Sequence, residues 1–501
     1  MKRTNRISRY FHVPIKKLER SSMEDTNDSL LLNTINTFSD CDDLTRYSLK
    51  NKQLQFLYFK SLIDKKTYEQ EVLYPFEALK DDNKTVSAYL ENEQFENVRT
   101  SEDITERILN GYIAIFLNQS EAYVINAFGP KTRSIEESET ETTIVGSHES
   151  FIESLAMNLS LVRRRVRSPK LKVVYVSVGE ISRNTVALLY IEGLVDMELL
   201  DQVKQKINDV EVDIAVDTPV FVQMIDDFPY SFMPQYITTE RPDVVVSNLA
   251  NGKIAGIMDN SPTAFLAPTN FFDFFHSPDD RNQRWAVGSA TRVLRMLAFF
   301  ITLTFTAFYV AVTTFHYEMI PEALLMSLAE SRNNVPFSPL FEALIMEVTI
   351  ELLREAGARL PTKIGQTIGI VGGIVIGQSA VQAGLVSNTL IIVVAISAIA
   401  SFVMPSYMIS AALRIARFGL ILLSGLLGNY GLLIGIILLL AHLSTLSNLS
   451  TPYFNPASPF HPKELINAVL RVPYGKNSRR PTQTRTQNKE DVKSLGTGEY
   501  E

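Results

Sequence analysis

The stretch "FEALIMEVTIELLREAGARLP", residues 341–361, places charged side chains between segments that are apolar enough to cross a lipid bilayer. Several of these charges fall within about 100° of one another on a helical wheel: Glu347, Glu351, Arg354 and Glu355. A charge at the centre of a bilayer costs roughly 2.5–3.5 kcal/mol on insertion scales, so this face must meet water, protein or lipid headgroups. The stretch therefore predicts an amphipathic helix at residues 338–356.

Two environments fit this helix. It can lie in the membrane interface, or it can be a re-entrant or vestibule helix whose carboxylates concentrate cations near a pore. The alternation of Glu and Arg favours ion pairs at i,i+3 and i,i+4 over metal chelation, so we expect Arg354 to pair with Glu351 or Glu347. The candidates for a charged vestibule or interface helix are Glu347, Glu351, Arg354 and Glu355.

The flanking segments contain long runs without charged side chains. Tyr309 is the only ionisable residue from Met296 to Phe315, and Asp, Glu, Lys, Arg and His are absent between Lys363 and Arg414. Such runs predict membrane spans, because about 20 apolar residues cross the hydrocarbon layer. The expected spans are residues 296–315, 364–386, 388–411 and 418–446.

The topology of these spans is left open. Four crossings return the C-terminus to the side of the N-terminus, but they place Arg414 and Arg417 on the outer side, against the positive-inside tendency. A fifth crossing by the charged helix would move both arginines inside and the C-terminal tail outside. The sequence supports either arrangement.

The part of the chain before the first span has the composition of a cytoplasmic protein region. It lacks the apolar stretch of a secretory signal, and its single cysteine, Cys41, excludes an intrachain disulfide and agrees with a reducing compartment. The net charge of −7 argues against a dedicated nucleic-acid binder. We therefore expect this N-terminal region to be cytoplasmic.

A weak internal repeat divides this region. "NGYIAIFLNQSEAYV" from Asn110 and "NGKIAGIMDNSPTAF" from Asn251 share the pattern of a helix end that leads into a β-hairpin, although chance similarity between hairpins is the alternative. Strand-like and helix-like segments such as "TVALLYIEG" and "DMELLDQVKQKIND" surround the second copy. We expect two related α/β lobes with a boundary near the basic run "RRRVRSPKLK".

The expected fold is an α+β cytoplasmic region of two α/β lobes followed by an α-helical polytopic membrane domain. The expected divisions are a disordered basic arm at residues 1–50, lobe 1 at 51–160, lobe 2 at 161–290, the membrane domain at 291–450 and a disordered tail at 451–501.

The segment "KIGQTIGIVGGIVIGQSAVQAG", residues 363–384, is the candidate pore helix. Glycine recurs at every fourth position, which allows another helix to approach closely: Gly365, Gly369, Gly373 and Gly377. A second stripe, within about 80° on the wheel, has polar ends and a valine waist: Thr367, Val371, Val375, Gln378 and Gln382. These are the pore-lining candidates, and the alternative is a helix that is buried all round.

Catalytic chemistry is not expected. The scattered histidines and the single cysteine do not assemble a nucleophile, a base and an orienting group, and ligand spacing typical of a metal site is absent. We therefore predict neither enzymatic activity nor a cofactor or metal.

Three long motifs resemble one family. They are "TTERPDVVVSNLANGKIAGIMDNSPTAFLAPTNFFDFFHSPDDR", "TFHYEMIPEALLMSLAESRNNVPFSPLFEALIMEVTIELLREAGARLP" and "IGQTIGIVGGIVIGQSAVQAGLVS". In this order they are similar to the A subunit of bacterial spore germinant receptors, the GerA family. The resemblance covers about residues 50–450 and leaves out the arm and the tail.

The resemblance implies a protein of the spore inner membrane that acts with a transporter-like B subunit and a lipoprotein C subunit. It further implies that the complex senses nutrients, and that the A subunit forms a homo-oligomer in the lipid that conducts ions, such as monovalent cations, and triggers germination. A secondary transporter of a small nutrient and a membrane scaffold of the receptor are the alternatives.

Overall fold

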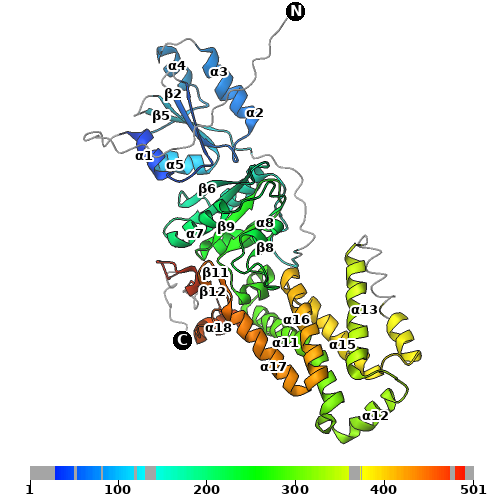
Figure 1. The fold of residues 1–501 in the computed structure, drawn as a ribbon. Coiled ribbons are helices and arrows are strands. Elements are labelled where there is room, and N and C mark those ends of the chain that lie inside the picture. The colour runs from blue at the N-terminus through cyan, green and yellow to red at the C-terminus, as the bar shows by residue number, and fades with distance from the viewer. Residues whose placement is uncertain are drawn as a thin grey trace, which may run out of the picture.

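The structure is a computed structural model, and it describes residues 29–49, 54–79, 83–117, 121–129, 141, 143–359, 373, 375–473 and 480–490. Figure 1 shows lobe 1 (residues 30–126), then lobe 2 (residues 155–275), and beyond lobe 2 the helical region (residues 285–445). Lobe 2 lies between lobe 1 and the helices, so lobe 1 is the part farthest from the apolar segments.

Lobe 1 is an antiparallel sheet with helices on both faces. Its described strands run in the order β1 (Leu44–Leu49), β2 (Leu54–Phe59), β4 (Tyr112–Leu117), β5 (Glu121–Asn126) and β3 (Glu96–Val98). One face is covered by α1 (Leu30–Thr37) and α5 (Ser101–Leu109). The other is covered by α2 (Lys65–Thr67), η2 (Tyr68–Leu73), α3 (Tyr74–Ala78) and α4 (Asn83–Leu90). Side chains that alternate along β2 enter these two cores, because successive strand residues point to opposite faces.

Lobe 2 repeats this arrangement. Its described strands run in the order β6 (Leu171–Val178), β7 (Asn184–Ile191), β9 (Ile254–Met258), β10 (Ala264–Ala267) and β8 (Ile237–Thr239). The helices α6 (Leu155–Arg165) and α9 (Pro242–Ala250) cover one face, while α7 (Met197–Asn208) and α8 (Thr218–Met224) cover the other. In both lobes the strand order, counted along the chain, is first, second, fourth, fifth, third.

The two Asn-Gly turns occupy equivalent positions. Asn110 ends α5 and Gly111 follows with φ of 87°, while Asn251 ends α9 and Gly252 follows with φ of 84°. Each turn leads directly into the fourth strand of its sheet. A positive φ closes a helix at little cost only with glycine, so both turns have the same physical cause. This confirms the predicted equivalence of the two segments.

A buried ion pair joins the lobes. Arg163 of α6 donates from Nε and Nη2 to the two carboxylate oxygens of Asp43, over 2.9 and 2.7 Å, and these side chains are 1% and 3% exposed. The backbone N–H of Asp42 donates to the carbonyl oxygen of Val173 in β6, over 2.9 Å. The loop before β1 is therefore attached to the edge of the second sheet.

Two predicted domain boundaries are wrong. Residues 29–49 lie inside the predicted arm but form α1 and β1, because Ser29 caps α1 and Leu31 packs into the core of lobe 1. The predicted division at residue 160 cuts α6, whose Leu159 and Val162 pack into the core of lobe 2. The helices α1 and α6 are short, so tertiary packing and not local pattern stabilises them.

The junction between lobe 2 and the helical region is aromatic and charged. The elements η3 (Phe271–Phe275) and α10 (Pro278–Asn282) lead into α11 (Trp285–Phe315). Asp280 of α10 accepts from both Nη atoms of Arg295 in α11, over 2.8 and 2.5 Å. Burial opposes ionisation of Asp280, but the hydrogen bonds and charge of Arg295 outweigh it and lower the pKa of this carboxyl.

After α11, the helical region continues through η4 (Tyr317–Met319), α12 (Glu322–Arg332), α13 (Pro339–Arg359), α15 (Asn388–Phe402), α16 (Tyr407–Leu427) and α17 (Asn429–Thr445). Among the described residues, α11 and α16 are long and apolar enough to cross a membrane, and α15 and α17 are apolar but shorter. Figure 1 shows α12 at the end of the molecule farthest from the lobes.

The predicted spans agree with these helices in some places and differ from them in others. Residues 296–315 lie within α11, as expected for a single helix. The predicted spans 388–411 and 418–446 are wrong as continuous helices. The first is interrupted after Phe402, near Pro405, and the second is interrupted at Gly428, whose φ is 62°. Residues 364–372 and 374 of the predicted span 364–386 lie outside the described residues, and residues 375–382 are helical.

The C-terminal segment contains β11 (Ser447–Asn448), β12 (Thr451–Pro452), α18 (Pro462–Val469) and η5 (Thr482–Thr484). It folds back onto lobe 2 at β11 and η5, while α18 packs against α11. Asn448 Nδ2 donates to the Gln235 carbonyl oxygen over 2.9 Å, and Asn270 Nδ2 donates to Gln483 Oε1 over 2.6 Å. The predicted disordered tail is therefore wrong for residues 451–473 and 480–490. Polar side chains that look solvated in the sequence find their partners on lobe 2.

We predict that Asp43→Asn lowers the free energy of unfolding by about 3–5 kcal/mol, because it leaves the buried Arg163 without its counter-ion. Urea unfolding of the detergent-solubilised full chain, followed by circular dichroism, measures this. The matched control is Glu96→Gln, which removes a 2.8 Å ion pair with Arg107 whose side chains are 53% and 39% exposed. The control should cost less than about 1 kcal/mol. Equal losses in both variants would show that the buried Arg163–Asp43 pair stabilises the chain no more than an exposed pair does.

Candidate functional site

The charged helix α13 directs its glutamates into the helical region. Glu347 is 0% exposed, and its Oε2 lies 2.7 Å from Nη2 of Arg417 in α16, which is also 0% exposed. Thr306 of α11 donates to Glu347 Oε1 over 2.9 Å, and Arg417 Nη1 donates to Ser397 Oγ of α15 over 3.1 Å. This contact therefore links α11, α13, α15 and α16.

The Glu347–Arg417 contact is an ion pair without a well-aligned hydrogen bond. In the part of the chain that the structure describes, neither Glu347 Oε2 nor the Nε and Nη2 groups of Arg417 has a hydrogen-bond partner of good geometry. The attraction between the charges thus compensates incompletely for the loss of water. Such a pair depends strongly on the relative positions of α13 and α16.

Two further ion pairs lie along α13. Glu351 Oε1 is 3.0 Å from Arg414 Nε, and Glu342 Oε1 is 3.2 Å from Nη2 of Arg332, in the last turn of α12. Glu342 Oε2 also accepts from the backbone N–H of Ser387, over 3.0 Å. We call Glu342–Arg332, Glu347–Arg417 and Glu351–Arg414 the α13 ion pairs. With a rise of about 1.5 Å per residue, the three carboxylates extend over roughly 13 Å of the helix.

The predicted partner of Arg354 is wrong. Arg354 does not form an ion pair with Glu347 or Glu351; its Nη2 donates to Ser401 Oγ over 2.7 Å, and its guanidinium lies over the ring of Phe402 at 4.6 Å. An i,i+4 pair does occur at Glu355 and Arg359, whose closest atoms are 2.5 Å apart. The helix is also longer than the predicted residues 338–356. On its charged face, Glu347 and Glu351 meet protein, because the arginines of α16 provide their counter-ions, whereas Glu355 is exposed.

The candidate pore positions are only partly described. Gly365, Thr367, Gly369 and Val371 lie outside the described residues. Val375 is 54% exposed, and Gln378 and Gln382 are exposed. A Cβ added at Gly373 or Gly377 would meet no described atom within 4 Å. The described part of this helix therefore presents Gly373, Val375, Gln378 and Gln382 to the outside of the single chain, whereas Gly377 is buried.

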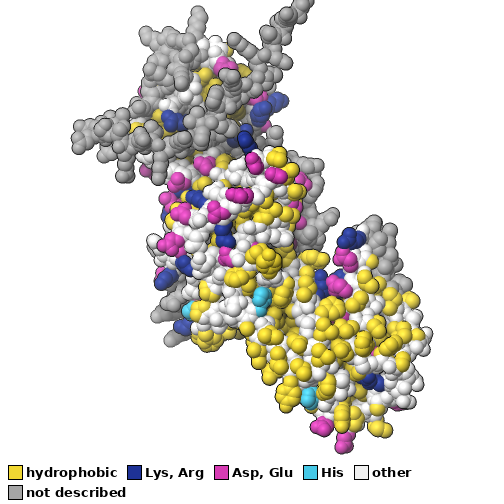
Figure 2. Space-filling view, in the orientation of Figure 1, with side chains coloured by type: hydrophobic (Ala, Val, Ile, Leu, Met, Phe, Trp, Pro, Cys, Tyr) yellow, Lys and Arg dark blue, Asp and Glu magenta, His cyan; other side chains and the backbone are white. Residues whose placement is uncertain are grey.

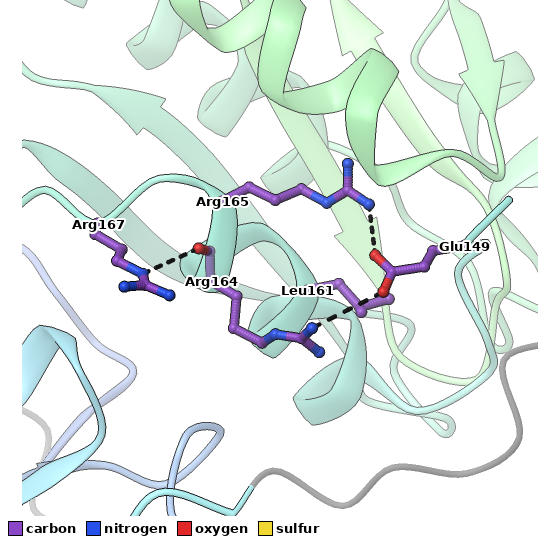
Figure 3. Close-up of a pocket in the computed structure, with 5 residues that line it drawn as sticks. All are labelled: Glu149, Leu161, Arg164, Arg165 and Arg167. Carbon is purple, nitrogen blue, oxygen red and sulfur yellow. Dashed lines mark hydrogen bonds and ion pairs between the residues drawn. The ribbon is translucent and has the colours of Figure 1, made fainter. Parts of the chain in front are cut away.

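A basic pocket lies beside α6, the helix that carries Arg163 of the interlobe ion pair. Figure 3 shows this cavity of about 280 Å³, which is lined by Glu149, Leu161, Arg164, Arg165 and Arg167. Arg165 Nη2 donates to Glu149 Oε2 over 2.5 Å, and Arg164 Nη2 is 3.9 Å from Oε1. Arg167 donates to Asn110 Oδ1 of lobe 1 over 3.3 Å. The sequence marked this basic run only as a lobe boundary, and its separate contacts appear only in the folded chain.

Neither pocket nor ion pairs form a metal centre. Within the described part of the chain, no group of three or more His, Cys, Asp or Glu side chains is close enough to hold a metal ion. The glutamates of the α13 ion pairs instead each face an arginine. These ion pairs hold α12, α13 and α16 in position relative to one another.

Comparison with known proteins supplies the family. The model of the family described as "Bacillus/Clostridium GerA spore germination protein" matches residues 33–483. The chain belongs to the GerA family. The match includes both lobes, the helical region and most of the C-terminal segment, so the GerA family shares the architecture described above and not one isolated motif.

Individual relatives support the same family assignment. The chain is 41% identical to spore germination protein GerQA of Bacillus cereus, over 88% of this chain and 89% of that protein. It is 38% identical to the uncharacterized membrane protein YfkQ of Bacillus subtilis, over 75% of this chain and 74% of that protein. The crystal structure of the N-terminal domain of the A subunit of the Bacillus megaterium spore germinant receptor GerK3 aligns with 48% of this chain and 94% of that chain, at 18% identity and a TM-score of 0.35.

We predict that Glu347→Gln and Arg417→Gln each lower the stability of this GerA-family protein by about 3–5 kcal/mol, because each leaves a buried charge alone. The double variant should recover much of the loss. Thermal unfolding of the detergent-solubilised chain measures all three.

The matched control for these variants is Glu355→Gln, which breaks the exposed pair with Arg359 on the same helix and should cost less than about 1 kcal/mol. Additive losses in the double variant would show that Glu347 and Arg417 do not stabilise one another.

Proposed function

We propose that this protein is the A subunit of a nutrient receptor in the spore inner membrane, and that several copies surround an ion-conducting pore whose opening triggers germination. The family match and the spore germination relatives support the receptor assignment. A transporter-like B subunit and a lipoprotein C subunit are the proposed partners. Monovalent cations are the proposed permeant ions.

The helical region is proposed to be the membrane domain. The lengths and composition of α11 and α16 support this, and α15 and α17 add apolar helices beside them. The helical region starts next to lobe 2 at α11, and the segment after α17 binds lobe 2 again through Asn448 and Leu449. The chain therefore crosses the membrane an even number of times. In this arrangement both lobes and the C-terminal segment are cytoplasmic.

One observation carries the pore proposal: Gln378 and Gln382 are exposed on a helix within the apolar part of the chain. An amide that faces lipid lacks hydrogen-bond partners and costs several kcal/mol on transfer to a hydrocarbon-like medium, on the order of 2–7. Facing an aqueous axis between copies removes this cost. Val375, one turn before Gln378, is also exposed and would then line an apolar constriction that closes by dewetting.

The remaining candidates fit around this axis. Gly365, Gly369, Gly373 and Gly377 would form the close contact with a helix of a neighbouring copy. Gly373 supports this, since it is exposed and no described atom lies within 4 Å of its Cβ position, whereas Gly377 is buried within the chain. Thr367 and Val371 would continue the polar and apolar parts of the lining. Glu351, Arg354 and Glu355 would border a charged vestibule, while the buried Glu347 holds α13 in place.

We expect Val375→Ala to cause ion leak and germination without nutrient, because a shorter side chain widens the constriction. Val371→Ala should do the same, and a bulkier residue at either position should block the response without preventing assembly. The measurements are conductance of the purified chain in planar bilayers and germination of spores without nutrient. The control is Val348→Ala, the same change at a 48% exposed position of α13. Wild-type conductance and germination in both test variants would refute the constriction.

Oligomeric state separates this proposal from its alternatives. Native mass measurement of the full chain in lipid should give a ring of several copies. A monomer or dimer that binds labelled nutrient by itself would favour a secondary transporter. A ring without conductance in the presence of both partner subunits and nutrient would favour a scaffold.

A further inference from the structure

A loop of lobe 2 presents aromatic side chains at the edge of the helical region. Residues 226–234, "DDFPYSFMP", connect α8 to β8. Phe228, Tyr230 and Phe232 are 37%, 102% and 40% exposed, whereas the next residue, Met233, is 2% exposed and belongs to the core of the helical region. We call residues 228–232 the aromatic loop. It exposes large apolar rings where lobe 2 meets the helices.

The aromatic loop is attached to α17. Ser231 Oγ lies 3.0 Å from Nε2 of His442, and the ring of Phe232 stacks on the imidazole with centroids 5.3 Å apart and planes at 16°. His442 is in the last turn of α17, which ends at Thr445. The loop therefore lies level with the end of α17 that is nearer to lobe 2.

Hydrogen bonds also hold the base of the loop. Gln235 Oε1 accepts from the backbone N–H groups of Asp227 and Phe228, over 2.9 and 3.2 Å, and Gln235 Nε2 donates to the Phe228 carbonyl oxygen over 2.8 Å. Tyr453 donates to the Pro234 carbonyl oxygen over 2.7 Å. Since these bonds already fix the backbone, little conformational entropy is lost when the exposed rings make a contact.

The loop continues an apolar stripe of α17. Leu438, Ile434 and Tyr430 precede His442 at intervals of four residues on the same helix face, and they are 59%, 44% and 72% exposed. The stripe has aromatic rings at both ends and aliphatic side chains between them, which is the pattern of a surface that crosses from one membrane interface to the other. Figure 2 shows the hydrophobic surface of the helices extending onto the adjoining part of lobe 2.

The charge of the aromatic loop indicates whether it contacts an anionic headgroup or the boundary between headgroups and acyl chains. The aromatic loop contains no ionisable side chain other than Tyr230, and the neighbouring Asp227 is paired with Lys206. The tip is therefore neutral and amphipathic, which suits the boundary between headgroups and acyl chains better than an anionic headgroup.

We infer that the aromatic loop is a lipid anchor: Tyr230 and Phe232 enter the interfacial layer of the bilayer and hold lobe 2 against the membrane surface. The occupant is lipid and not a second copy of the chain, because the loop is continuous with the exposed stripe of α17. The inference rests on the proposed membrane embedding of the helical region. Since α17 is about 25 Å long and the hydrocarbon layer about 30 Å thick, the loop at its end reaches the interface.

Tryptophan fluorescence of the full chain in lipid tests the lipid anchor. The full chain has one tryptophan, Trp285, which is 55% exposed, so Trp285→Phe provides a silent background. In that background we would compare Tyr230→Trp, Leu438→Trp on α17 and Tyr74→Trp on lobe 1, in nanodiscs of phosphatidylcholine with or without bromine in the upper acyl chain. Bromine should quench Tyr230→Trp and Leu438→Trp several-fold more than Tyr74→Trp, and adding anionic lipid should leave the quenching of Tyr230→Trp unchanged.

The outcomes are distinguishable. Quenching of Leu438→Trp without quenching of Tyr230→Trp overturns the anchor and leaves the membrane domain in place. If neither Leu438→Trp nor Tyr230→Trp is quenched, both the lipid anchor and the proposed membrane domain are overturned. If bromine fails to quench Tyr230→Trp, aqueous iodide separates the causes: quenching by iodide shows a solvated loop, and resistance to iodide shows a loop covered by protein. Either result refutes the lipid anchor.

Discussion

The ion pair between Glu347 and Arg417 constrains the whole helical region, because both charges are fully buried and each is costly without the other. Thr306 and Ser397 add hydrogen bonds from two more helices. A shift of α13 along α16 by one turn would separate these groups and also the neighbouring Glu351–Arg414 pair. The α13 ion pairs thus fix the register of helices that apolar packing alone would leave free to slide.

The soluble lobes form a frame that is attached to the helices at several places. Phe271 and Phe275 of η3 pack against Phe299 of α11, with ring centroids 5.8 and 5.4 Å apart. The C-terminal segment returns to lobe 2, where Tyr453 is fully buried beside the same aromatic cluster. Lobe 1 is fixed to lobe 2 by Arg163 and Asp43. Packed aromatic rings therefore join the helical region to lobe 2, and a buried ion pair joins lobe 2 to lobe 1.

Membership of the GerA family agrees with this organisation. An element that switches between states needs well-defined positions. A helix positioned by buried ion pairs has this property, since intermediate positions leave charges unpaired. In the helix at residues 375–382, Val375, Gln378 and Gln382 are exposed, while Ala380 and Val381 pack against the core of the helical region. The duplicated lobes provide two similar surfaces on the proposed cytoplasmic side.

The sequence by itself determined the features that depend on local pattern. Apolar runs located the helices, and the Asn-Gly segments identified the repeated lobes, because a glycine with positive φ after a helix is a local requirement. Local pattern did not show that Gly428 breaks an apolar run, that α1 folds, or that the C-terminal segment binds lobe 2. Local pattern also predicted that Arg354 pairs with a glutamate of its own helix, α13. Tertiary structure decided which arginines face Glu347 and Glu351, because a buried charge is neutralised by whichever helix packs against it, however distant in sequence.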